Sequence, residues 1–381
     1  MQDSACLWLL FATFAAKFKT MLIGNEDVVR MKRALLLAAV TLLSATPMWS
    51  DGINYNGTAL QENIDFVRSE CGTMSKNTIK EVSGLACSRQ TAGYLWAHGD
   101  ENTGNKRQII ALQPDGTLAM TVHLTTEGSD RDDWEDIATG SYEGENYVFV
   151  GAIGDNDLQY KDAYYIYYLE EPSVVAGKTM TVSAKWIRFG FPDNQAHNAE
   201  VLMYDNVEQM FYVVDKEDGA CHLYMLPFRT DYGSAVQRLT VVCALGNGNK
   251  FKKATGGDIT PDGRWMAIKN KSYVLLWERQ GLESLSETAK REPVQVAAYE
   301  KEEQGESLAW LDGTTFYTTS DSKNDTPIYK YVRAYDSGMA VIPAVSVERS
   351  RNARLVLRNG QVLVLVGEKA YTLSGVCVPN F

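Results

Sequence analysis

The chain has 381 residues, of which 45% are hydrophobic, and its 48 Asp and Glu residues outnumber its 37 Lys and Arg residues to give a formal net charge of −11. Composition of this kind is typical of a globular chain with a sizeable core. The acidic balance argues against nucleic acid as a partner, because phosphate neutralisation needs a basic face, and it suits a cation better.

The first 50 residues have the features of a leader. Two apolar runs, residues 7–16 and 34–43, are too short to span a bilayer, which needs about 20 apolar residues. Met31-Lys32-Arg33 and the following ALLLAAVTLLSA match the basic and apolar regions of a secretory signal peptide, so we expect Met31 as the true start. The predicted location is extracellular or at the outer-membrane surface, with the periplasm as the alternative, and no transmembrane span is expected.

Residues 51–79 form a polar lead-in, after which one short pattern recurs five times. Each copy has an acidic or small residue followed by apolar residues, as in WEDIA, and we take Gly84, Asp136, Glu200, Asp258 and Ser307 as equivalent. Their spacing of 49 to 64 residues is near the length of a propeller blade with loop insertions. The repeats therefore predict supersecondary units arranged in a ring.

Each repeat contains further runs rich in β-branched and aromatic residues, such as YVFVGAI, which predict strands. The first four units have four runs each; their predicted fourth strands are residues 118–124, 181–189, 238–245 and 294–299. Turn signals such as Asp115-Gly116 and Asp262-Gly263 separate the runs. Four strands per unit predict an all-β fold, a single β-propeller over residues 80–333.

The fifth unit has no obvious fourth strand, so we expect residues 64–69 to supply it and close the ring. Five four-stranded blades are favoured. Six blades are the alternative, with the additional blade formed by residues 334–348 and the N-terminal segment.

The C-terminal residues differ from the propeller. Residues 334–350 are expected to be a linker, and residues 351–381 alternate strongly and turn at Asn359-Gly360, which predicts a short β-meander. This tail, with Arg358-Asn359-Gly360 and the ending Tyr371-Thr372-Leu373-Ser374-Gly375, resembles the sorting domains of type IX secretion in Bacteroidetes. The resemblance implies the type IX machinery as a partner; the alternative is a final hairpin on the propeller.

The blade phrases WEDIA, GAIGDND and QGESLAWLDG are similar to a family of secreted bacterial β-propellers of uncharacterised function, loosely grouped with phytase-like and SdiA-regulated propellers. The resemblance covers nearly all of residues 80–332. It implies fold and export, and it supplies no activity.

Carboxylates are expected to converge on the channel, because the first strand of each blade lines it. The residues predicted there, as metal ligands, are Glu135, Asp136, Glu200, Asp258 and Glu306. Acids that meet around one axis repel one another, so some must be protonated, paired with a base or bound to a cation. Oxygen donors suit calcium, which we expect as the candidate cofactor.

Further polar residues follow the second strands. The predicted ligand-binding residues are Asp100, Asn102, Asp155, Asn156, Lys216 and Lys269. Asp and Asn are also the residues that β-turns prefer, so turn formation is the competing interpretation of the GDND loop. His98 is the expected general base near neutral pH, acting with Glu135 and Asp136 if the site is catalytic.

Cysteine usage leaves two alternatives. Cys71 with Cys87, or Cys221 with Cys243, would form disulfides in an oxidising compartment, or these residues are small buried hydrophobes. With no CxxC motif and four His, a zinc site built from Cys and His is not expected.

The sequence thus predicts an exported binding or scaffold propeller whose acidic mouth holds a cation and presents loops to a small-molecule, glycan or protein ligand. A calcium-dependent hydrolase of phosphoesters or lactones is the alternative. A third interpretation gives the acids only a structural role in bracing blade turns. Neither a GxSxG nor an HExxH motif occurs.

Overall fold

A computed structural model describes residues 64–99, 107–129, 131–246, 251–297, 299–302 and 304–334, together with four strands between residues 353 and 378. The chain divides into two compact units, Met1–Val332 and Arg333–Phe381. Apart from the short helix α3 (Leu285–Thr288), the described elements are strands, so the prediction of an all-β fold is confirmed. None of the described helices has the length and apolar character that crossing a membrane requires. The predicted leader, residues 1–50, lies outside the described residues.

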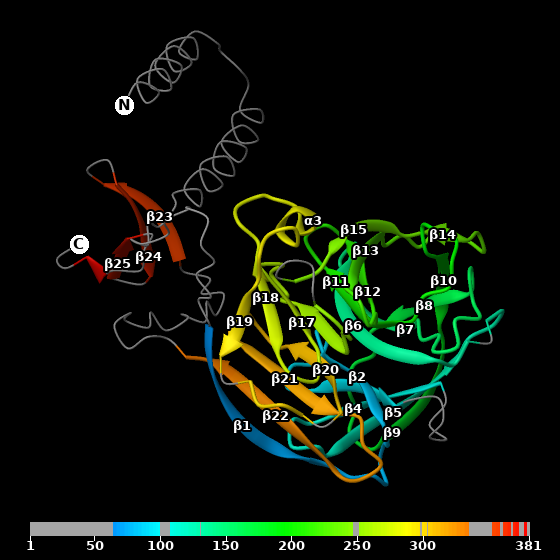
Figure 1. Ribbon diagram of the computed structural model, residues 1–381. Helices are drawn as coiled ribbons and strands as arrows, with labels where there is room; N and C mark the ends of the chain where they lie inside the picture. The colour runs from blue at the N-terminus through cyan, green and yellow to red at the C-terminus, as the bar shows by residue number, and fades with distance from the viewer. Residues whose placement is uncertain are drawn as a thin grey trace, which may run out of the picture. The chain divides into compact units, whose positions relative to one another are not determined.

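Antiparallel four-stranded units follow one another along the first part of the chain (Figure 1). The first consists of β2 (Val82–Cys87), β3 (Leu95–Gly99), β4 (Gln108–Leu112) and β5 (Leu118–Thr125), and the second of β6 (Trp134–Tyr142), β7 (Glu145–Ala152), β8 (Tyr164–Glu170) and β10 (Lys185–Gly190). The third consists of β11 (Ala199–Asp205), β12 (Met210–Asp215), β13 (His222–Pro227) and β15 (Thr240–Ala244). The fourth consists of β16 (Gly256–Ile259), β17 (Trp265–Lys269), β18 (Val274–Glu278) and β19 (Val294–Ala297), and the fifth of β20 (Gly305–Trp310), β21 (Thr315–Ser320), β22 (Thr326–Arg333) and β1 (Ile64–Met74).

The first strands of these units form the inner ring. Strand β2 contacts both β6 and β20, and β11 contacts β6 on one side and β16 on the other. The contact between β16 and β20 completes the circle. Five units form this ring in the described part of the chain.

Strand β1 supplies the outer strand of the fifth unit, as predicted for residues 64–69. It lies beside β22 and also pairs in parallel with β19 of the fourth unit, through Ile64 with Val296 and Asp65 with Ala297 (Figure 1). Because β1 precedes and β22 ends the propeller sequence, this sheet joins the two ends of the ring.

Two of the predicted fourth strands are wrong, because each is divided between two sheets. Residues 181–189 were expected to be one strand, but β9 (Lys178–Ser183) pairs in parallel with β5 of the preceding unit, and only β10 belongs to its own. Residues 238–245 divide in the same way, into β14 (Gln237–Arg238), which pairs with β10, and β15. Each extension covers the exposed edge of its neighbour's outer strand, which would otherwise present unpaired backbone groups.

The core consists of clusters that lie between neighbouring units. Phe149 of the second unit packs on Tyr204 and Phe211 of the third, with ring centroids 4.7 and 4.9 Å apart. Comparable clusters join the first unit to the second, the third to the fourth, the fourth to the fifth, and the fifth to the first. These apolar clusters therefore hold neighbouring sheets side by side. The polar residues considered below lie at the ends of the inner strands.

The C-terminal compact unit, Arg333–Phe381, contains an antiparallel meander of β23 (Ala353–Arg358), β24 (Gln361–Val366), β25 (Lys369–Thr372) and β26 (Cys377–Val378). This agrees with the alternating pattern and the turn signal at Asn359-Gly360. The sorting function of this tail stays a prediction.

The four cysteines whose side chains are described, Cys71, Cys87, Cys221 and Cys243, are free thiols. Cys87 and Cys221 are fully buried, and burial raises the pKa of their thiols to about 12 and about 11. Of the two alternatives, the structure therefore shows small buried hydrophobes at these two positions.

Candidate functional site

The candidate site lies where the inner strands begin and the second strands end. Strands β6, β11 and β20 each carry a β-bulge near their first residue, where pairing with the second strand shifts by one position. The extra residues are Glu135, Glu200 and Glu306. A bulged residue leaves the ladder and its side chain is re-aimed, which is common beside functional sites. We call these three residues the glutamate mouth.

The bulges correct the alignment of the repeats. Val201, not Glu200, is the residue of β11 that corresponds to Asp136 of β6, because each follows the bulge in its strand. A shift of one residue in a strand exchanges its two faces. The five predicted metal ligands therefore divide into two groups, the bulge glutamates and two aspartates that pair in the ladder, Asp136 after the bulge of β6 and Asp258 in the regular strand β16.

Asp136 and Asp258 belong to the second group and bind backbone. Asp136 accepts hydrogen bonds from the N–H groups of Ile137 at 2.8 Å and Leu202 at 2.9 Å, the latter in the next inner strand. Asp258 repeats this with Ile259 at 2.7 Å and Trp310 at 2.8 Å. Both carboxylates brace neighbouring units, and these contacts give their predicted metal role no support.

The glutamate mouth brings acids from three units together. Burial raises the pKa of Glu135 well above its usual range, and the nearby carboxylates of Glu200 and Asp133 raise it further. Burial also raises the pKa of Glu306, again with a contribution from Glu200. Burial raises the pKa of Glu200 as well, against lesser opposing effects from Lys216, Asn198 and a hydrogen bond with Glu135. The three carboxylates therefore share one electrostatic environment.

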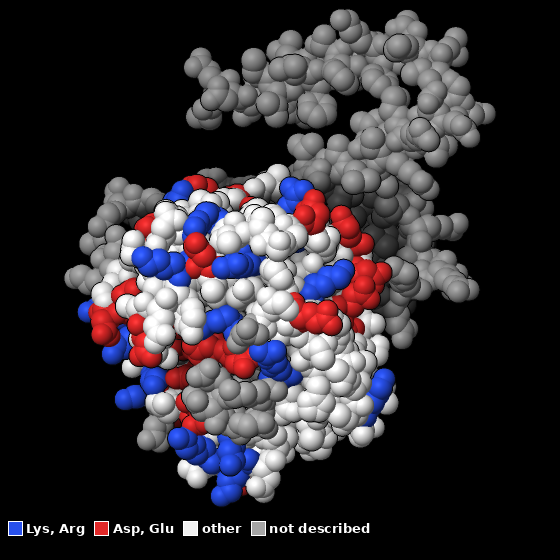
Figure 2. Space-filling view, turned by 90° about the vertical axis from the view of Figure 1, so that its right-hand side faces the viewer, with Lys and Arg blue, Asp and Glu red and all other residues white. Residues whose placement is uncertain are grey.

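Two lysines partly offset the glutamate mouth. Lys216 Nζ lies 2.7 Å from Oε1 of Glu200, and Lys271 Nζ lies 3.8 Å from Oε1 of Glu306. Burial opposes the charge on Lys216, but the glutamates raise its pKa above the usual value. Charges of both signs are also interspersed on the face shown in Figure 2. Neither of these two ion pairs includes Glu135.

The GDND loop contributes one residue to the mouth and uses another as a turn brace. Asp155 is buried and accepts hydrogen bonds from the backbone of Gln159 and Tyr160 and from the hydroxyl of Tyr164, at 2.8 to 2.9 Å. This is the turn-forming role. Asn156 accepts from Asn198 Nδ2 at 3.1 Å, and the same amide reaches Oε1 of Glu200 at 3.2 Å.

Gly154 allows the GDND loop to lie against the mouth. A Cβ at this position would lie 2.2 Å from Oε1 of Glu135 and 2.6 Å from Oδ2 of Asp133. A residue with a side chain would therefore displace both carboxylates.

Lys269 lies in a separate buried ion pair. Its Nζ is 3.0 Å from Oε2 of Glu302, both side chains are almost completely buried, and the Thr318 hydroxyl donates to the other oxygen of Glu302. Burial lowers the pKa of Lys269. An ammonium group with no exposed surface has no access to a ligand, so its contacts give structural support only.

His98 is also enclosed. Its ring has no exposed surface and lies against Trp134, with centroids 5.9 Å apart. Burial lowers its pKa to about 4. The imidazole is therefore neutral near pH 7, but it has no contact with solvent. Its predicted role as a general base stays a prediction, and this buried environment gives it no support. Asp100 and Asn102 lie outside the described residues.

A cleft of about 610 Å³ lies at the fifth unit, and none of the predicted site residues is among its lining residues. Arg68, Glu302, Asp321 and Lys323 are among its lining residues, and the glutamate mouth does not contribute to it. Sequence reasoning missed Asp133, Asn198 and Lys271 as neighbours of the mouth. The signal for Asp133 was present, because it lies two residues before Glu135 in the acidic run DDWED.

No protein-family model matches the chain, and no curated protein matches its sequence. Among solved structures, it is similar to the β-propeller domain of Cps50 (Swd1) from Myceliophteria thermophila, with 10% identity and a TM-score of 0.32 over 65% of this chain and 83% of that one. It is also similar to PQQ-bound aldose sugar dehydrogenase from Streptomyces coelicolor, with 11% identity and a TM-score of 0.37 over 70% and 98% of the two chains. Hydrazine synthase from Kuenenia stuttgartiensis gives 11% identity and a TM-score of 0.35 over 75% and 99%.

Likeness at this level of identity concerns the fold alone and carries nothing about ligand or reaction. The closed ring that the inner strands of successive four-stranded units form confirms the prediction of a β-propeller.

Proposed function

We propose that this chain is a binding propeller whose glutamate mouth takes a cation, with calcium as the first candidate. The observation that carries the proposal is the convergence of Glu135, Glu200 and Glu306 from three units: burial raises the pKa of each, and acidic neighbours raise the pKa of Glu135 and of Glu306 further. Three carboxylates against two lysines leave an excess of negative charge. A proton on Glu135 or a bound cation would offset it.

The donor set favours a hard cation. The carboxylates of the mouth lie beside that of Asp133, and calcium binds oxygen ligands of this kind in irregular geometry. The Asn198 amide donates to Glu200 and orients it. Lys216 limits the site, because its ammonium group already binds Glu200. Binding would therefore centre on Glu135 and require loss of its proton, so affinity would increase with pH.

Calcium titration of the purified chain by calorimetry tests the proposal. The expected result is binding that is stronger at about pH 8 than at about pH 6, accompanied by proton release, and lost in Glu135→Gln. Glu145→Gln, which removes an exposed carboxylate of β7, is the matched control and should bind as the parent does. Unchanged calcium binding in Glu135→Gln, or no calcium binding by the parent at either pH, would contradict the proposed cation site.

Export is part of the proposed function. Its support is the signal-like segment from Met31 and the resemblance of the tail to sorting domains, and the ligand presented to the loops would then be a glycan, protein or small molecule outside the cell. Hydrolysis of phosphoesters or lactones is the competing function. A screen of both classes that finds calcium-dependent turnover, lost in Glu135→Gln, would establish hydrolysis in place of binding alone.

A further inference from the structure

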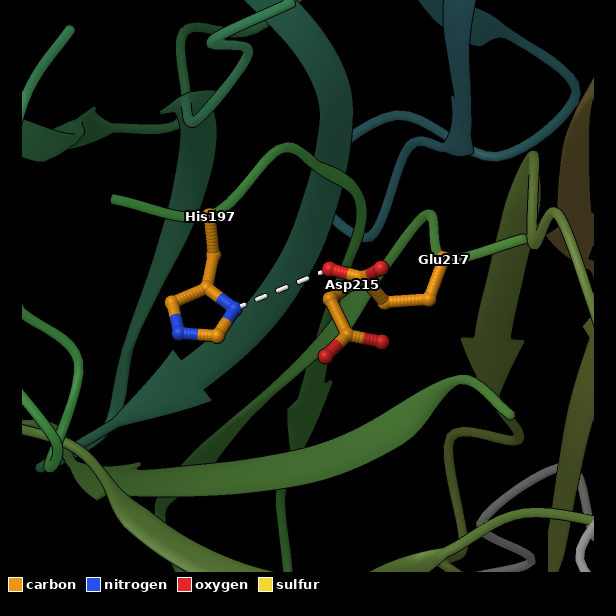
Figure 3. Close-up of side chains that lie close together, drawn as sticks. All are labelled: His197, Asp215 and Glu217. Atoms are coloured by element: carbon orange, nitrogen blue, oxygen red, sulfur yellow. Dashed lines mark ion pairs between the residues drawn. The ribbon is translucent and has the colours of Figure 1, made fainter. Parts of the chain in front are cut away.

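A second group of possible metal ligands lies in the third unit, apart from the glutamate mouth. His197 precedes β11, Asp215 ends β12, and Glu217 follows two residues later (Figure 3). One ligand atom from each side chain lies within 4.8 Å of the other two. We call this group the His197 triad. Lys216, between its two acids, binds Glu200 instead, as expected where neighbouring side chains point to opposite sides.

The hydrogen bonding of His197 leaves one ring nitrogen available. Its Nε2 lies 2.9 Å from Oδ2 of Asp193, and Nδ1 is buried without a hydrogen-bond partner. A proton on Nε2 that is donated to Asp193 leaves the lone pair on Nδ1. Metal-binding histidines almost always donate their second ring nitrogen to a carboxylate or carbonyl in this way.

That lone pair faces a carboxylate. Nδ1 lies 3.8 Å from Oε1 of Glu217, and Figure 3 shows the ring turned toward this group. A lone pair and a carboxylate repel each other unless a proton or metal ion lies between them. Packing fixes the ring, because His197 lies 4.4 Å from Phe191 between centroids. The arrangement is therefore suited to a cation between His197 and Glu217.

Asp215 is held in place by its own neighbours. Its side chain is fully buried, and Oδ1 accepts from the backbone N–H of His222 at 2.6 Å. Oδ2 accepts from the Tyr224 hydroxyl at 3.0 Å and lies 3.2 Å from Nδ1 of His222. These bonds orient the carboxylate and leave a lone pair of Oδ1 for a further ligand. Glu217 is half-buried, and its backbone carbonyl accepts from the Lys253 N–H at 3.0 Å, so its side chain is the part that can turn toward an ion.

We propose that His197, Asp215 and Glu217 bind a divalent first-row transition ion, with zinc as the first candidate. One imidazole nitrogen and two carboxylates suit such an ion better than calcium, which prefers oxygen alone. Bonds of about 2.0–2.2 Å place tetrahedral zinc ligands roughly 3.3 Å apart. The spread within the triad is larger, so the Glu217 side chain turns toward the ion, and water completes the coordination. Asp193 acts as the positioning residue for His197.

Cobalt titration tests this site, because Co²⁺ replaces Zn²⁺ and absorbs in the visible range. The full chain should give d–d bands on addition of Co²⁺, and added Zn²⁺ should remove them, while an excess of Ca²⁺ should not. His197→Ala and Glu217→Gln should each weaken binding at least about 10-fold, and Asp193→Asn about 10- to 100-fold. His123→Ala, which removes an exposed histidine of β5, is the matched control.

Melting temperatures without metal show whether each variant folds. Glu217→Gln changes a half-buried loop side chain and keeps the test valid if His197→Ala fails to fold. Equal Co²⁺ affinity in the parent, Glu217→Gln and Asp193→Asn would overturn the proposal, as would the absence of any saturable Co²⁺ or Zn²⁺ binding by the parent.

Discussion

Two buried side chains, Asp258 and His98, should make stability depend on pH in opposite directions. Burial raises the pKa of Asp258 to about 6, against lesser opposing effects from Arg89 and two backbone hydrogen bonds, and burial lowers the pKa of His98 to about 4. Between about pH 4 and 6 the folded chain keeps a proton on Asp258 that the unfolded chain has released, so this group makes stability fall as pH rises. Over about pH 4 to 6.5 the unfolded chain protonates His98 and the folded chain does not, so stability rises with pH.

Urea unfolding between about pH 4.5 and 6.5 should separate the contributions of Asp258 and His98 to the pH dependence of stability. Relative to the parent, Asp258→Asn should make the free energy of unfolding rise more steeply with pH, and His98→Asn should make it rise less steeply. Each pKa unit corresponds to about 1.4 kcal/mol, so a change of about 2 to 3 kcal/mol across the window is expected. Glu145→Gln should leave the slope unchanged. A slope that moves in the same direction in both variants would contradict the assignment.

At the residue scale, the sequence predicted the acids at the inner strands but not their roles. WEDIA and AEVLMYD look alike, yet a β-bulge places Glu135 and Glu200 in the mouth while Asp136 binds the backbone of the next unit. A bulge depends on the pairing of two strands, which one strand's sequence does not contain. The role of His197 was not foreseen for a related reason, since Asp193 and Glu217 meet it only through the fold.

At the element scale, β1 closes the ring through one face only. Phe66 is buried and packs on Trp310 and Phe316, with ring centroids 6.3 and 5.0 Å away, whereas Val67 on the opposite face is 62% exposed. Phe66→Ala should therefore lower the free energy of unfolding by about 3 to 5 kcal/mol, because it leaves a cavity at the joint. Val67→Ala should change it by less than about 0.5 kcal/mol.

Chemical denaturation of the two variants with the parent measures this difference. Equal losses for Phe66→Ala and Val67→Ala would show that β1 contributes through its backbone alone.

The local sequence pattern predicted most of the strands, but it did not predict which strands pair with one another. Runs of β-branched and aromatic residues identified the strands, and the missing fourth strand of the last unit pointed to residues 64–69 as the closure. The division of residues 181–189 between β9 and β10 was missed because β9 completes a neighbouring sheet in parallel, and period-two alternation says nothing about which edge a strand joins.

At the scale of the whole molecule, the two ends of the chain should differ in what their removal does. Strand β1 lies between β19 and β22 in one continuous sheet, so a chain that begins after Met74 loses the element that joins the fourth and fifth units. Residues beyond 334 contribute none of the described strands to the sheets of the ring, and β23 to β26 pair only with one another. The outcome of truncation therefore reports directly on how the ring is closed.

A chain that ends at residue 334 should keep the thermal transition of the full chain, followed by circular dichroism. A chain that starts at residue 75 should unfold at a lower temperature and associate on size-exclusion chromatography, because it exposes the unpaired edges of β19 and β22. Adding a peptide that spans residues 64–74 should raise its transition temperature in a concentration-dependent way, since a ligand that binds only the folded form stabilises it. If both truncations melt like the full chain, β1 does not hold the ring together, and closure must rest on the interior packing between the first and fifth units.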